Sequence, residues 1–136
     1  MRFQILIYNN AEFEEALENG LTEELDSTHR ALIGELIASG ELVDTNELST
    51  EAAVTVRVDP ANPKNMLALD GPFSESKEWV GGFYLVDVDS IERAVEIAGR
   101  FVEARFSPVE VRQLVHSGDP AAESAGDSAA TASPSA

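Results

Sequence analysis

The sequence predicts a small α+β domain in which two helices cover one face of an antiparallel sheet. Apolar and polar residues alternate in several short segments, which indicates strands because successive strand side chains point to opposite faces. Two longer segments repeat apolar residues at helical spacing, as helices packed against a sheet do. Of the 136 residues, 43% are hydrophobic, which is enough for one core but not for two.

The chain opens with a predicted strand over residues 2–8, where apolar residues occupy every second position. A helix is expected next. Thr22 can cap its start, two glutamates in its first turn suit the positive end of the helix dipole, and Gly40 closes it. The apolar stripe of this helix includes His29.

Short strands are expected over residues 41–44 and 54–58. Residues 59–63 contain two prolines and an asparagine and therefore predict a turn. Residues 66–69 then either extend the preceding strand or pair with it. Residues 70–78 form a polar loop that opens on an aspartate, a glycine and a proline.

Residues 79–88 are rich in aromatic and β-branched side chains and predict another strand. Asp89 and Glu92 resemble a capping box for a second helix, which ends before Pro108, and residues 109–115 supply the last strand. The order β-α-β-β-β-α-β is close to the ferredoxin-like split βαβ arrangement with one added hairpin strand.

Helices on one face leave the other face of the sheet uncovered, and that face is expected to carry Leu6, Tyr8, Phe83 or Leu85. The simplest cover is a second copy of the chain, packed sheet to sheet in a two-fold homodimer.

The domain is expected to span residues 1–116. Apart from one Glu and one Thr, residues 117–136 are all Ala, Ser, Gly, Asp or Pro, and none of them is aromatic or branched aliphatic. They therefore predict a disordered tail. The start lacks the pattern of a signal peptide and no apolar run approaches the roughly 20 residues that span a bilayer. A cytoplasmic location is therefore expected, without membrane insertion.

Charge and cysteine content narrow the functions. The formal charge is −16 and the nine basic residues are scattered, so neither nucleic acid nor an anionic membrane surface is an expected partner. With no cysteine, disulfides, thiolate nucleophiles and cysteine-held metals are excluded. His29 and His116 are the only histidines and no spaced ligand set appears, so no metal or cofactor is expected.

One long motif resembles a known family. The run Asp-Gly-Pro-Phe-Ser-Glu-Ser-Lys-Glu at residues 70–78, followed by Gly-Gly-Phe-Tyr-Leu-Val-Asp-Val at 81–88, resembles the DGPF subset of YCII-related proteins. The opening strand, the histidine-bearing helix and the closing strand from residue 109 extend the resemblance over nearly the whole domain. It implies a dimeric α/β barrel of ferredoxin-like subunits, with an unassigned function in most members.

The resemblance also implies a site. YCII-type proteins use a His–Asp pair in a pocket between helix and sheet, and some relatives are lyases acting on breakdown products of halogenated aromatics. His29 matches the helix histidine; Asp70 is the first candidate for its acidic partner and Asp44 the second. Such a pair could abstract a proton next to a carbonyl. The alternative is that His29 is a structural residue bonded to a backbone carbonyl or water.

Phe73, Ser74 and Lys77 are candidate substrate-binding residues, with Lys77 as the cation for an anionic substrate group. The Asp-Gly-Pro-Phe segment can equally be a structural turn pinned by Phe73. Gly81 and Gly82 predict a bulge or a close backbone approach and not a nucleotide site.

The sequence therefore leaves open whether the protein is an enzyme. The first hypothesis is that it is a cofactor-independent lyase or isomerase acting on a small organic substrate. The second is a non-catalytic small-molecule-binding or regulatory dimer module, and a third is a dimerising unit for another protein.

Overall fold

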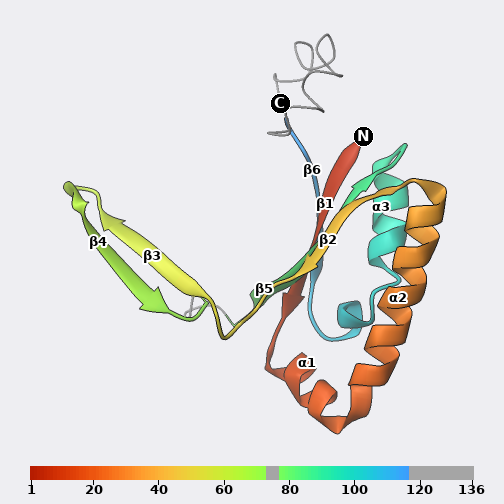
Figure 1. Ribbon diagram of the computed structural model, residues 1–136, viewed down its shortest axis with the longest axis horizontal. Coiled ribbons are helices and arrows are strands. Elements are labelled where there is room, and N and C mark those ends of the chain that lie inside the picture. Colours follow the sequence, from red (N-terminus) through yellow and green to blue (C-terminus); the bar gives the residue numbers. More distant parts are fainter. Residues whose placement is uncertain (73–76, 117–136) are drawn as a thin grey trace.

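The computed structural model describes residues 1–72 and 77–116. They form an α+β body from which a long β-hairpin projects (Figure 1). In chain order the elements are β1 (Arg2–Asn9), α1 (Ala11–Ala16), a kinked turn η1 (Leu17–Leu21), α2 (Thr22–Ser39), β2 (Leu42–Glu47), β3 (Val54–Asp59), β4 (Asn62–Asp70), β5 (Trp79–Asp87), α3 (Ile91–Ala98), the 3₁₀ turn η2 (Val102–Arg105) and β6 (Val109–Gln113).

The body contains a four-stranded antiparallel sheet in the order β2-β5-β1-β6. The central strands β1 and β5 pair along their whole length, from Arg2 opposite Asp87 to Asn9 opposite Trp79. Helices α2 and α3 lie on the same side of this sheet (Figure 1). The ferredoxin-like α+β architecture expected from the sequence is confirmed.

The core lies between the sheet and these two helices. Strand β1 shows why the sequence alternates, because Phe3, Ile5 and Ile7 are buried while the residues between them are partly exposed. Leu32 and Leu36 of α2 and Ile97 of α3 meet these strand residues in one cluster. The uncovered face of the sheet carries Leu6, Tyr8, Phe83 and Leu85, all of intermediate exposure.

The hairpin differs from the expected arrangement. Of the two alternatives for residues 66–69, pairing with the preceding strand is the one that occurs. Thr55 lies opposite Leu69, and Val58 lies opposite Met66. However, β3 and β4 form a separate two-stranded sheet and do not add a strand to the main sheet. The turn is also tighter than expected, because β4 already begins at Asn62.

The helices also begin and end differently from their predicted limits. Residues 11–16 form a helix that was missed, capped by the Asn10 side chain, which accepts a hydrogen bond from the Phe13 backbone N–H at 2.9 Å. Helix α2 continues from it through a kink at Gly20 (φ 104°), so Thr22 is not a side-chain cap. The predicted cap of α3 at Asp89 is wrong by one residue, since Ser90 accepts the bond from the Arg93 N–H.

The C-terminal helical segment is broken where one continuous helix was expected. Helix α3 ends at Ala98, with Gly99 as its C-cap, and the chain then turns into η2. Gly40 closes α2 with a left-handed conformation (φ 78°), as expected.

The expected irregularity at Gly81 and Gly82 is confirmed. The pairing of β1 with β5 shifts between Ile7 and Tyr8. A Cβ at Gly81 would lie 2.1 Å from Nδ2 of Asn9, so the Asn9 side chain occupies the space that any larger residue would need.

Part of what the sequence predicts concerns residues that the structure does not describe. Phe73, Ser74 and the predicted disordered tail at 117–136 lie outside the described residues. Within residues 1–72 and 77–116, no helix is long and apolar enough to cross a membrane.

Candidate functional site

A cavity of about 820 Å³ opens between α1, α2 and one end of the sheet. Its volume falls within the range of pockets that bind small organic molecules. The residues that line it come from β1, from α1 and the turn after it, from α2, from β2 and the loop after it, from β5 and from η2. The residues concerned are Ile7, Asn9, Phe13, Glu14, Leu17, Thr22, Leu25, Asp26, His29, Ile33, Thr45–Glu51, Gly81–Tyr84 and Glu103.

His29 is held in the wall of this cavity by two side chains. Its Nε2 lies 2.8 and 2.9 Å from the two carboxylate oxygens of Glu103, and its Nδ1 lies 2.6 Å from the hydroxyl of Tyr84. The three residues come from α2, β5 and η2. The His29 side chain is 18% exposed and that of Glu103 is 9% exposed, so the pair is shielded from bulk water.

The chemistry of the partners assigns the protons. An ionised carboxylate can only accept, so Nε2 of His29 carries the hydrogen that Glu103 receives. Nδ1 of the neutral ring is then an acceptor and takes its bond from the Tyr84 O–H. Burial, and after it the negative charge of Glu103, raise the pKa of Tyr84 well above its ordinary value. Tyr84 is therefore a neutral phenol throughout the working pH range.

Aromatic packing fixes the orientation of the histidine ring. The ring centroid of Phe101 lies 5.3 Å from that of His29 and 4.7 Å from that of Tyr84. These separations are typical of favourable aromatic pairs. The imidazole is thus held by two hydrogen bonds at its edge and by packing against Phe101.

The turn that presents Glu103 is tied to the rest of the body on both sides. Arg105 pairs with Glu24 of α2. The Ser107 hydroxyl donates to the backbone oxygen of Tyr8, and the Asn10 amide donates to the Phe106 carbonyl at 2.8 Å. These contacts hold η2 against both α2 and the end of β1.

The candidate acidic partners lie elsewhere. Asp70 ends β4, is exposed and pairs through its backbone with Val54. Asp44 is exposed in β2, where its carboxylate accepts from the backbone of Thr45 and the amide of Asn46. The carboxylate bonded to His29 is therefore that of Glu103, and neither predicted pairing occurs.

Lys77 is exposed and is not part of the cavity lining. Acidic side chains line the cavity instead: Glu14, Asp26, Glu47, Glu51 and Glu103. Among the described lining residues there is no lysine or arginine. The local field thus favours neutral or positively charged molecules over anions.

The sequence singled out neither Tyr84 nor Glu103 as a candidate site residue. Gly99 could have indicated that the helix stops before Glu103, because a glycine near the end of an amphipathic pattern often ends the helix. No group of three or more His, Asp and Glu side chains suited to a metal occurs in the part of the chain that the structure describes.

Comparison with known proteins identifies the family of this chain. The model of the YCII-related domain family matches residues 1–117. An uncharacterised protein of Rhizobium meliloti (strain 1021) is 31% identical over 117 residues, which is 84% of this chain and 92% of the relative. Neither description names an activity. The chain belongs to the YCII-related domain family.

Proposed function

We propose that this protein is a cofactor-independent lyase or isomerase that moves a proton on a small organic substrate. The observation that carries the proposal is the position of His29, in the wall of a cavity and hydrogen-bonded to Glu103 through one nitrogen and to Tyr84 through the other. A residue in this setting has the means to take a proton and to return it.

The reaction begins at Nδ1 of His29. A substrate carbon next to a carbonyl loses its proton to Nδ1, and the electron pair of the broken C–H bond moves onto the carbonyl oxygen as an enolate. The Tyr84 hydroxyl, released from Nδ1, donates to that oxygen. Glu103 stabilises the imidazolium that forms and keeps the ring in place.

Two outcomes complete the cycle. In an isomerase, the substrate also has a carbon–carbon double bond conjugated with the enolate, so the imidazolium returns the proton to the far carbon of that double bond while the double bond shifts and the carbonyl re-forms. In a lyase, the enolate expels a leaving group from the neighbouring carbon and the imidazolium protonates that group. Atoms and electrons balance in both outcomes, and neither needs an oxidant or a cofactor.

The charge of the cavity limits the substrate class. Five carboxylates line the described part of the cavity, and only one of them, Glu103, is bonded to His29. A neutral or cationic carbonyl compound fits this field, whereas a substrate held by an anionic group does not. The proposed anchoring role of Lys77 has no support in the geometry.

Proton exchange with solvent tests the proposal before the physiological substrate is known. The protein is incubated in D₂O with neutral and cationic carbonyl compounds, and deuterium uptake is followed by NMR. The expected result is uptake with wild type, a loss of roughly 10²-fold or more in His29→Asn, and a loss of similar order in Tyr84→Phe.

Lys77→Ala is the matched control, since Lys77 is charged but lies outside the cavity, and it should exchange like wild type. Equal exchange by wild type and His29→Asn would contradict the proposal. So would a compound that binds tightly and never exchanges, which would support the non-catalytic binding module instead.

A further inference from the structure

Asn9 places a second polar group in the wall of the cavity that contains His29. Its side-chain amide packs directly over Gly81, because the position that a Cβ of Gly81 would take lies 2.1 Å from Nδ2, 2.6 Å from Cγ and 2.9 Å from Oδ1 of Asn9. A glycine at this point of β5 leaves the space open, whereas a larger residue would displace the amide. The glycine therefore makes room for the Asn9 side chain beside the cavity.

The Asn9 amide is available to a ligand. Within residues 1–72 and 77–116, no group forms a hydrogen bond with this side chain. The neighbouring Asn10 is different, because its amide accepts from the Phe13 N–H and donates to the Phe106 carbonyl. The amide of Asn10 is thus used by the fold, and that of Asn9 is not.

Asn9 and the proposed reaction centre lie at different ends of the cavity. Tyr84, which bonds His29, lies opposite Ile5 of β1, and Asn9 is four residues further along that strand. Since strands advance about 3.3 Å per residue, these positions are about 13 Å apart along the sheet, and a ligand that reaches both side chains spans about 10 Å. Ile7 lies between them on the same face of β1 and also lines the cavity. The wall is therefore polar at both ends and apolar between them.

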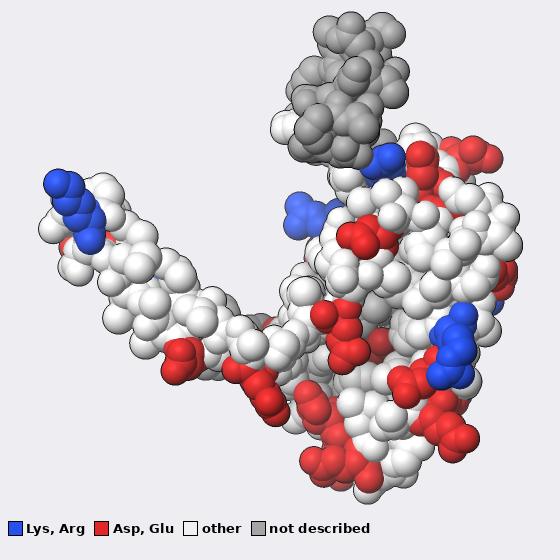
Figure 2. Space-filling view, viewed as in Figure 1, with Lys and Arg blue, Asp and Glu red and all other residues white. Residues whose placement is uncertain are grey.

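The chemistry around Asn9 favours an uncharged group with both a donor and an acceptor. An asparagine amide presents an N–H and a carbonyl side by side, whichever way it is turned. Glu14 lines the same cavity, and acidic side chains stand over the end of the body where α1 lies (Figure 2), so a carboxylate is repelled. An ammonium group can only donate, and a ketone or ester can only accept. A carboxamide does both and carries no charge.

We propose that Asn9 binds an amide group at the far end of an elongated, uncharged ligand. The ligand amide accepts from Nδ2–H of Asn9 and donates to Oδ1, and its apolar chain lies along Ile7. A carbonyl group at the other end lies at His29, and this part of the inference rests on the proposed function. The substrate class is thereby narrowed from carbonyl compounds in general to compounds that carry a carboxamide at a distance.

Calorimetric titration with a matched pair of ligands tests the inference. The first is a keto-amide in which six CH₂ groups separate a methyl ketone from a primary amide, and the second is the diketone in which a methyl group replaces the NH₂. The wild type should bind the keto-amide about tenfold more tightly, because only the amide satisfies both the donor and the acceptor of Asn9. Asn9→Leu, which has a similar shape and no polar atoms, should bind the two ligands equally. Asn9→Ala should do the same without placing bulk over Gly81.

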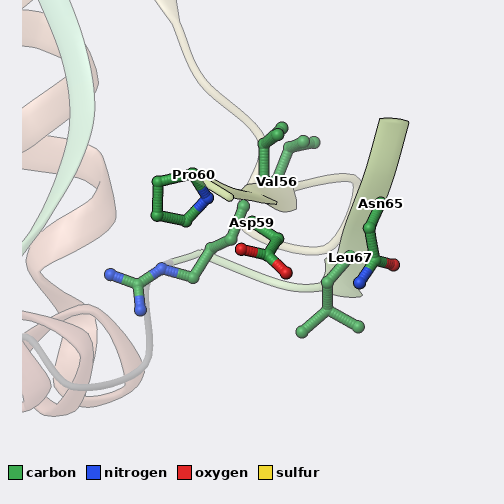
Figure 3. Close-up of a pocket in the computed structure, with 7 residues that line it drawn as sticks. Val56, Asp59, Pro60, Asn65 and Leu67 are labelled. Carbon is green, nitrogen blue, oxygen red and sulfur yellow. The ribbon is translucent and has the colours of Figure 1, made fainter. Parts of the chain in front are cut away.

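Asn65→Leu is the matched control. Asn65 also belongs to a strand, but it lines a separate hollow on the β3–β4 hairpin (Figure 3), so this variant should keep the tenfold preference. Equal affinity of the wild type for the two ligands, including no measurable binding of either, would overturn the inference. So would a preference that survives both Asn9→Leu and Asn9→Ala.

Deuterium exchange next to the ketone of the keto-amide separates this inference from the proposed function. An amide preference that depends on Asn9, without exchange, would support binding by Asn9 and contradict the proposed reaction. Exchange that depends on His29, without an amide preference, would overturn binding by Asn9 and leave the proposed reaction in place.

Discussion

Nε2 of His29 lies 2.8 Å from the carboxylate of Glu103, a residue 74 positions further along the chain. The whole Glu103 residue, backbone included, is only 7% exposed. Because a buried carboxylate without a partner is costly, this contact stabilises the fold as well as the proposed site. Glu103→Ala should therefore lower both stability and proton exchange, while Glu103→Gln, which keeps the shape and removes the charge, should lower exchange with a smaller loss of stability.

The first prediction concerns Tyr84 at alkaline pH. Since burial raises its pKa, the folded protein keeps this phenol protonated above pH 10, where the unfolded chain ionises. The unfolded state then binds fewer protons, and stability falls as pH rises beyond about 10. In a Tyr8→Phe background, which leaves Tyr84 as the only tyrosine, absorbance at 295 nm should not rise until the protein unfolds. Ionisation near pH 10 with the fold intact would contradict the burial argument.

The second prediction concerns acid stability. Hydrogen bonds from the Arg93 guanidinium and then from the Ser39 hydroxyl lower the pKa of Glu41 to about 2. The unfolded chain binds this proton at higher pH, so the contribution of Glu41 is present above pH 4.5 and is lost as pH falls toward 2. Glu41→Gln should cost about 1 kcal/mol at pH 7 and flatten this acid loss in chemical denaturation.

Glu96→Gln is the control for that experiment, because Glu96 also pairs with Arg93 but its side chain is 66% exposed. Its effect should stay within about 0.5 kcal/mol. Equal losses of stability from the two substitutions would contradict the larger contribution that we assign to the Glu41–Arg93 pair.

The third prediction compares two glycines. Gly81→Ala places a Cβ 2.1 Å from Nδ2 of Asn9, so the Asn9 side chain must turn away from its position beside the cavity, and because only the end of a side chain has to move we expect a cost of about 1 kcal/mol. Gly34→Ala, in the middle of α2 with nothing within 4 Å, should stabilise the protein by about 0.5–1 kcal/mol. Thermal unfolding measures both, and a neutral Gly81→Ala would mean that the bulge has room for a side chain.

The fourth prediction concerns ligand charge. Ligands of one carbon skeleton that differ only in charge should bind in the order cation, neutral molecule, anion, because carboxylates such as Asp26 and Glu47 line the cavity. Replacing both with their amides, Asp26→Asn and Glu47→Gln, should reduce this preference in calorimetric titrations. Preferential binding of the anion, abolished by Lys77→Ala, would restore the role first expected for Lys77.

The body of the fold followed from local patterns. Alternation over residues 2–8 correctly indicated which face of β1 is buried, and helical spacing in α2 places Leu32 and Leu36 in the core although the neighbouring Ile37 is exposed. Residues 54–70 were harder to interpret, because Val54, Val56 and Val58 alternate like a strand buried on one face and yet are exposed. Periodicity indicates which side chains share a face, but it does not indicate what covers that face.

The site was only half predictable. His29 could be picked out as a polar residue on an apolar helical stripe, but its partners depend on tertiary contacts. Tyr84 lies on the buried face of β5, and Glu103 reaches His29 only because the chain turns after Gly99. The Asp-Gly-Pro-Phe motif directed attention to Asp70, which the hairpin carries away from the cavity.

Glu103 and Tyr84 together hold His29 in one tautomer, with the base at Nδ1. Long-range ¹⁵N–¹H NMR of the imidazole at neutral or slightly alkaline pH measures this directly, and His116→Gln isolates the signal because His29 is then the only histidine. Wild type should show the Nε2–H tautomer, and Glu103→Gln should show a mixture of the two tautomers. An Nδ1–H tautomer in wild type, or no change in the variant, would contradict it.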